Sequence, residues 1–166
     1  RAIDTQAKQL QEVCTHMAAH DGAAVVEVLQ NCVIFNDGAH KEVTDKEVRD
    51  DRQLWLEHGK PMIFGKNRDK GIVLRGTRLE VVTIGENGIT EDDILVHDET
   101  TENTGIHMML AQMRPPQFPM AFGVIRAYKQ PTYNQLFEKQ MQEAQENPKI
   151  KCVDDLLNSG ETWEVK

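Results

Sequence analysis

Apolar residues near the start of the chain follow two different spacings. One set recurs every three or four residues, as on one face of a helix, and comprises Ile3, Ala7, Leu10, Cys14 and Met17. Residues 23–29 (AAVVEVL) are instead almost continuously apolar, which is typical of a parallel strand buried on both faces. A helix followed by such a strand is one repeat of a doubly wound α/β sheet.

Beyond residue 40 the pattern predicts shorter elements. A short helix over 44–56 would turn its apolar side chains inward. Apolar residues 62–64 and 72–74 flank the polar loop 65–71, whose two ends are glycines, as expected for a β-hairpin. A further strand is predicted over 79–84 (LEVVTI).

The C-terminal part of the chain alternates between helical and extended patterns. Residues 90–93 have the spacing of a capping box, and a helix over 104–114 is expected to stop at two prolines. We expect a strand over 121–127 and an amphipathic helix from residue 132 to the Asn-Pro pair at 147–148. The last residues would form a docked tail through Val153, Leu156, Leu157 and Trp163.

Charge and composition narrow the class of protein. The chain has 166 residues, a net charge of −8 and 39% hydrophobic residues, which suits a globular protein and argues against nonspecific binding of nucleic acid. Residues 60–78 carry a local net charge of +5, with Asp69 as their single acid. This basic segment is a candidate docking face for an anion or an acidic partner. No stretch approaches the roughly 20 apolar residues of a membrane helix.

The cysteine content indicates the cellular compartment, and the first residue indicates whether the chain is part of a longer one. Three cysteines, Cys14, Cys32 and Cys152, are an odd number and lack the density of a secreted disulfide scaffold. We therefore expect a reducing cytoplasm. The chain begins with Arg1 rather than Met, so we expect it to be part of a larger polypeptide.

Cys32 lies where the apolar run gives way to a polar, turn-rich loop. A side chain at the end of a buried strand is where an α/β protein meets a ligand or cofactor. A thiolate ligates iron or zinc well, but an iron–sulfur cluster usually takes four thiolates, and this chain has no C-x-x-C pair. From the residues alone a buried thiol and a ligand both stay open, and the tendency of free cysteine to lie in cores favours the buried thiol.

The other candidate sites have simpler explanations. His16 and His20 have a helical ligand spacing, but Asp21 is the nearest further ligand. Residues 91–93 (EDD) match no calcium loop and suit a helix N-terminus. The loop 65–71 lacks the order G-x-x-x-x-G-K-[ST], so a solvated hairpin tip is favoured over an anion site. The sequence contains neither a nucleophile elbow nor a dinucleotide fingerprint.

Longer strings resemble a known family. Residues 30–39 (QNCVIFNDGA) and 56–71 (LEHGKPMIFGKNRDKG) closely resemble the β subunit of 2-oxoacid:ferredoxin oxidoreductases, most of all the 2-oxoglutarate type. The likeness continues through 82–88 (VTIGENG), 94–98 (ILVHD) and 154–160 (DDLLNSG), and so covers essentially the whole chain. Strings of this length are far more specific than a short motif.

The resemblance implies an enzyme that decarboxylates 2-oxoglutarate on thiamine diphosphate with Mg²⁺, passes electrons through a 4Fe-4S cluster to ferredoxin, and transfers the succinyl group to coenzyme A. Three cluster cysteines of that family lie in the N-terminal half of the β subunit, and a fourth ends a later strand. Cys32 matches that fourth position, so the resemblance makes it the candidate metal ligand. The other cluster cysteines and the Gly-Asp-Gly diphosphate motif belong to the half that this chain does not match. The implied protein partners are an α subunit and ferredoxin, with no nucleic acid and no membrane.

The fold class implied is α/β. Residues 1–37 would be the last helix and strand of a thiamine-diphosphate-binding fold, a mostly parallel sheet flanked by helices, and residues 38–166 a mixed α/β extension. Alone, this part of the subunit is expected to be inactive. Two alternatives remain, an enzyme for pyruvate or another 2-oxoacid and a non-catalytic interaction module. Lys66, Arg68 and Lys70 are predicted to face an acidic electron carrier.

Overall fold

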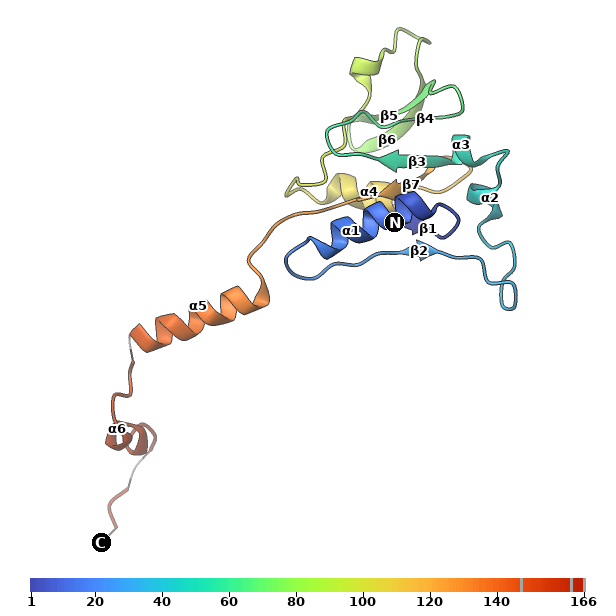
Figure 1. Cartoon of the computed structure of the whole chain (residues 1–166). Helices are drawn as coiled ribbons and strands as arrows, with labels where there is room; N and C mark the ends of the chain where they lie inside the picture. The colour runs from blue at the N-terminus through green and yellow to red at the C-terminus, as the bar shows by residue number, and fades with distance from the viewer. Residues whose placement is uncertain (147, 162, 166) are drawn as a thin grey trace. The chain divides into compact units, whose positions relative to one another are not determined.

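The computed structural model describes residues 1–146, 148–161 and 163–165, which form two compact units, Arg1–Lys129 and Gln130–Lys166 (Figure 1). The helices and parallel strand pairs of the first unit confirm the predicted α/β class. The domain boundary predicted after residue 37 stays a prediction.

The first unit begins with a β-α-β repeat. Strand β1 (Ala2–Ile3) and strand β2 (Val28–Leu29) are parallel neighbours, and helix α1 (Ala7–Ala18) connects them. This confirms the predicted helix and parallel strand, except that Ile3, predicted on the helix face, lies in β1 and is buried there. The prediction of a strand buried along residues 23–29 is wrong, because Leu29 is buried while Val25 is 96% exposed. The physical reason is that β1 pairs only with the end of the apolar run and leaves the rest uncovered.

A second parallel pair replaces the helix that the sequence predicts over 44–56. The chain forms the short helices α2 (Lys41–Thr44) and α3 (Arg49–Arg52) and then strand β3 (Gln53–Leu56), which pairs with β7 (Met120–Gly123). Pairing with a strand far along the chain buries three of the four β3 residues, and this outweighs the local helical pattern. The strand predicted over 121–127 exists but ends at Gly123, where the backbone turns to φ +91°.

The predicted β-hairpin is confirmed. Strands β4 (Ile63–Phe64), β5 (Lys70–Arg75) and β6 (Arg78–Thr83) form an antiparallel sheet. The predicted capping box at residues 90–93 is also confirmed, since Thr90 and Asp93 open the short helix η1 (Glu91–Asp93). Helix α4 (Gly105–Gln112) ends before the two prolines, as expected.

Two apolar clusters hold the first unit together. The larger lies between the antiparallel sheet, β3 and α4, and the smaller joins β1 and β2 to β7 through Ile3, Leu29, Met120 and Phe122. Arg1 and Gly123 exchange backbone hydrogen bonds, with the terminal ammonium donating to the Gly123 carbonyl at 2.8 Å and the Gly123 N–H donating to the Arg1 carbonyl at 2.9 Å. These bonds hold β1 beside β7, so the parallel pair of β1 and β2 adjoins the parallel pair of β3 and β7 (Figure 1).

The second unit contains helix α5 (Tyr133–Glu146), as predicted, and the short helix α6 (Val153–Leu157). Asn147, part of the predicted helix stop, lies outside the described residues. The side chains expected to dock the tail are exposed within this unit, so the predicted docking is not seen there: Val153, Leu156, Leu157 and Trp163.

Candidate functional site

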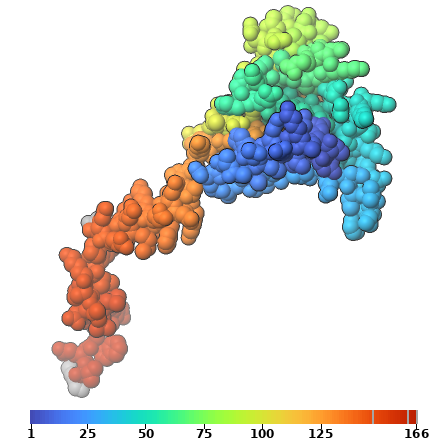
Figure 2. Space-filling model, viewed as in Figure 1, coloured from blue at the N-terminus to red at the C-terminus, as the bar shows by residue number. Residues whose placement is uncertain are grey.

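Cys32 lies on a loop that leaves the carboxyl end of β2. Its thiol is exposed and free, and the backbone closes around it through a bridge in which the Asn36 N–H donates to the Cys32 carbonyl at 2.9 Å. Residues 33–35 (VIF) at the loop tip are 73–89% exposed. The loop is the light-blue segment that projects from the first unit (Figures 1 and 2). Three large apolar side chains therefore form an exposed patch beside an open thiol.

A side-chain clamp closes the two ends of this loop, here called the Cys32 loop (residues 31–38). Asn31 Nδ2 donates to Asp37 Oδ1 at 3.0 Å, and the Gly38 N–H donates to Asn31 Oδ1 at 2.8 Å. Gly38 adopts a positive φ of 77°, which a side chain would strain. Asn31 therefore uses both ends of its amide to hold the loop that carries the thiol.

The described side chains near Cys32 could supply one ligand of a metal cluster, the Cys32 thiol itself, and no more. Among the described residues, no group of three His, Cys, Asp or Glu side chains could hold a metal ion. Cys14 is half-buried on α1, and Cys152 is exposed in the second unit, where its sulfur accepts a hydrogen bond from the Asp155 N–H. His16 and His20 are likewise not joined by a third ligand. A cluster at Cys32 therefore needs its other ligands from outside this chain.

A polar hollow of about 620 Å³, here called the basic hollow, opens where α1 begins. Its wall includes four basic side chains, those of Lys8, Arg49, Lys66 and Arg68, and two carboxylates, those of Asp50 and Glu57. Lys70, predicted to act with Lys66 and Arg68, donates instead to Asp51 Oδ1 at 2.7 Å. That hydrogen bond lowers the pKa of Asp51, so this pair is internally neutralised.

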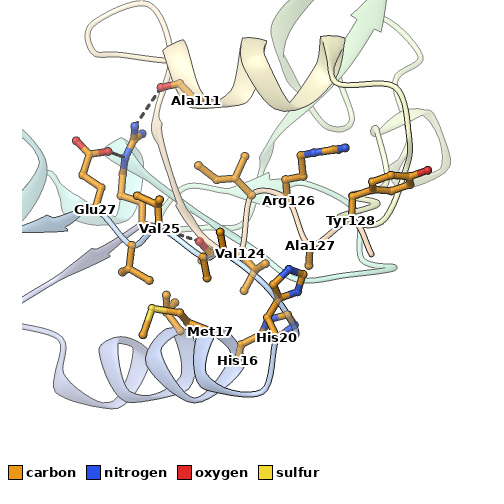
Figure 3. A pocket seen from close by; sticks show the side chains of 17 residues that line it. His16, Met17, His20, Val25, Glu27, Ala111, Val124, Arg126, Ala127 and Tyr128 are labelled. Carbon is orange, nitrogen blue, oxygen red and sulfur yellow. Dashed lines mark hydrogen bonds and ion pairs between the residues drawn. The ribbon is translucent and has the colours of Figure 1, made fainter. Parts of the chain in front are cut away.

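A second hollow, of about 450 Å³, lies between the end of α1, the apolar run 23–27 and residues 123–128 (Figure 3). Its floor is mostly apolar, and His16, His20, Arg126 and Tyr128 gather at one end (Figure 3). His16 Nε2 lies 3.2 Å from Glu99 Oε1, and the Arg126 guanidinium lies 4.7 Å from the centre of the Tyr128 ring. His16 and Arg126 thus already have partners, and the hollow lies where the predicted strand over 23–29 is uncovered.

Two buried histidines were not singled out by the sequence. His97 Nε2 donates to the Val124 carbonyl at 2.8 Å, and His107 Nε2 donates to the Asp98 carbonyl at 2.8 Å. Burial lowers the pKa of His97, against a smaller raising effect of its hydrogen bond to Val124. Both imidazoles tie the segment before α4 to its neighbours, which is a structural role. No spacing rule could have found them, because their partners are backbone carbonyls.

Comparison with known proteins finds one similar to this chain. The chain is 32% identical over 168 aligned positions to the 2-oxoglutarate oxidoreductase subunit KorB of Mycobacterium tuberculosis, an alignment that covers 99% of this chain and 44% of that protein. No model of a protein family matches the chain. No solved structure matches it either.

This similarity confirms the family resemblance stated from the sequence. The chain is similar to that oxidoreductase subunit over nearly all of its own length and spans less than half of the subunit, which is consistent with a C-terminal half. The mixed α/β fold, with parallel strand pairs flanked by helices, agrees with the C-terminal part of the fold that such subunits have. In the part of the chain that the structure describes, no helix is both long and apolar enough to cross a membrane.

Proposed function

We propose that this chain is part of the β subunit of an oxidoreductase that converts 2-oxoglutarate and coenzyme A to succinyl-coenzyme A and CO₂ while reducing ferredoxin. Thiamine diphosphate with Mg²⁺ would supply the carbanion chemistry of decarboxylation, and a 4Fe-4S cluster the electron transfer. The similarity to KorB supports the substrate class. The observation that carries the role of this chain is the exposed Cys32 thiol on a clamped loop at the carboxyl end of a parallel strand.

The chain would contribute one thiolate to the cluster. A cluster ligand must be a deprotonated sulfur held in a fixed position, and the Asn31 clamp restricts the loop from which the Cys32 thiol projects. The exposed apolar tip, residues 33–35, would pack against the α subunit or the other half of the β subunit and keep water from the cluster. The chain spans less than half of its relative. The remaining cluster ligands and the surface that covers the loop tip would therefore come from the rest of the β subunit or from the α subunit. Free cysteines suit the reducing cytoplasm in which we place the enzyme.

Replacing Cys32 in the assembled enzyme tests this assignment. Cys32→Ser is expected to remove the visible absorption and the bound iron of the cluster while the circular dichroism of the protein stays unchanged, because the residue is exposed and packs against no core side chain. Cys152→Ser is the matched control, since it also removes an exposed thiol. A Cys32→Ser enzyme with full cluster absorption refutes the ligand role.

Steady-state assays of the same enzyme decide the substrate. A kcat/KM that is higher for 2-oxoglutarate than for the other 2-oxoacids supports the proposal. A higher kcat/KM for pyruvate or a branched 2-oxoacid would show that the enzyme is a related oxidoreductase for that acid. An assembled protein that oxidises none of these acids is a non-catalytic module instead.

A further inference from the structure

We propose that the basic hollow is the docking face for the acidic protein that accepts electrons from the enzyme. This deepens the proposed function and rests on it, since it names where the electron carrier binds. The wall of the hollow has a net positive charge, although the whole chain carries −8. A local patch of the opposite sign attracts an acidic partner and orients it as it approaches.

The cations of the basic hollow come from separate parts of the chain, and not from the basic segment 60–78 alone. Lys8 comes from the first turn of α1, Arg49 from α3, and Lys66 and Arg68 from the loop between β4 and β5. Two further cations of the basic segment 60–78 are occupied elsewhere, because Lys70 pairs with Asp51 and Arg75 with Glu80 at 3.0 Å. The sequence predicts a face of Lys66, Arg68 and Lys70. The hollow instead joins Lys66 and Arg68 to Lys8 and Arg49, and Lys70 does not line it.

In the described part of the chain, the cations of the basic hollow make no close ion pair that would neutralise them. Within the described ranges, Lys66 and Arg68 make no ion pair, and Lys8 contacts Glu12 only at 3.9 Å with 85% of its side chain exposed. Arg49 lies 3.5 Å from Asp50, where both side chains are half-exposed. Long exposed pairs of this kind contribute little, so an incoming carboxylate competes with them easily.

The start of α1 adds to the attraction. Its first turn contains no acidic residue, and the side chain of its N-cap, Gln6, makes no capping hydrogen bond and instead donates to Gln53 Oε1 at 2.8 Å. The positive end of the helix therefore faces the hollow together with Lys8, an arrangement that is unfavourable until a negative group arrives.

Topology places the hollow where an electron carrier is needed. Strand β1 leads into the start of α1, and β2 leads into the Cys32 loop. Because β1 and β2 are parallel, their carboxyl ends lie at the same edge of the sheet. A protein seated in the basic hollow thus meets the edge from which the Cys32 thiol projects.

Exposure favours a protein over a small anion as the occupant. Small ligands are held in concave sites that desolvate most of their surface. Here Lys8, Lys66 and Arg68 are exposed, so no closed cradle exists for a single phosphate. Exposed charges around an open hollow are instead typical of the contacts that speed association of two proteins.

Two matched triple substitutions test the proposal. The docking variant carries K8E, K66E and R68E, and the control variant carries K46E, K60E and R78E, which are exposed cations outside the hollow. Both variants change the net charge equally, so only position differs. Ferredoxin binding to this chain at low salt, and kcat/KM for ferredoxin and for a small dye in the assembled enzyme, are measured.

We expect the docking variant to lose ferredoxin binding and to lower kcat/KM for ferredoxin about tenfold or more at low salt, with the loss fading at high salt and dye reduction unchanged. Equal effects of the two variants, or no effect of the docking variant, overturn the proposal. Binding of inorganic phosphate at millimolar concentration, with no binding of ferredoxin, also overturns it in favour of a small-anion site. If the wild-type enzyme reduces no dye, the proposed function fails, and the docking face is then judged by ferredoxin binding to this chain alone.

Discussion

Removing the Asn31 clamp is expected to open the Cys32 loop without unfolding the protein. Asn31→Ala deletes the hydrogen bond to the Asp37 carboxylate and the bond accepted from the Gly38 N–H. A hydrogen bond to a charged group contributes about 1.5–3 kcal/mol and a neutral one about 1 kcal/mol, and exposure reduces both. We therefore expect the loop to lose about 2 kcal/mol of local stability, or roughly a 30-fold rise in its open population.

Amide hydrogen exchange of Asn36 measures this opening. The Asn36 N–H donates to the Cys32 carbonyl, a bond that the substitution does not touch, so its exchange rate reports the loop rather than the deleted contact. The rate should rise roughly 30-fold in Asn31→Ala, while amides of β5 keep their protection.

A swap of the two partners provides the control. Asn31→Asp alone places two carboxylates at the 3.0 Å contact and should open the loop. Adding Asp37→Asn restores an amide-to-carboxylate bond with donor and acceptor exchanged, and the carboxylate introduced at position 31 still accepts from the Gly38 N–H. An Asn36 exchange rate that is unchanged in Asn31→Ala, or that the double substitution does not restore, refutes the reasoning.

Substitutions at three further positions, one of them with a compensating change, have defined outcomes. Gly71→Ala would place a methyl group against the Ile94 side chain in the core, so chemical denaturation should show a loss of about 1–3 kcal/mol, and Ile94→Ala should recover part of it by making room. Burial lowers the pKa of His97, so its contribution to stability is complete above the ordinary value of about 6.5 and is lost as the pH falls below it, when the unfolded chain takes up the proton first. His97→Gln keeps a donor for the Val124 carbonyl and should flatten the stability curve below that pH; an unchanged slope contradicts the assignment. Cys32→Ser in the isolated chain should leave the denaturation midpoint within experimental error, because its side chain is exposed.

Local signals in the sequence predicted part of the fold correctly. The hairpin of β4 and β5 follows from two apolar stretches around a glycine-bounded loop, and the capping box at residues 90–93 from two side chains three positions apart. Helix α5 follows from its apolar spacing. Each of these features is decided by contacts between residues near one another in the chain.

Features decided by distant contacts could not be predicted. Strand β3 exists because β7, more than sixty residues later, pairs with it, and no pattern in 44–56 contains that information. The basic hollow likewise combines Lys8 with Lys66 and Arg68 from separate segments. Cys32 is a candidate ligand through the family resemblance and its place after a strand, and this stays a prediction. The clamp by Asn31 needed the structure, since an asparagine in a loop has no distinctive spacing.

The open position of Cys32 has a consequence for handling the protein before any iron is present. An accessible thiol reacts with oxidants and with other thiols, whereas the half-buried Cys14 is shielded. Copies of the chain stored in air should therefore cross-link through Cys32 and Cys152, and anaerobic purification with a reductant should keep them monomeric. Under the proposed ligand role, iron bound to the Cys32 sulfur would block these reactions, so early insertion of the cluster would protect the thiol.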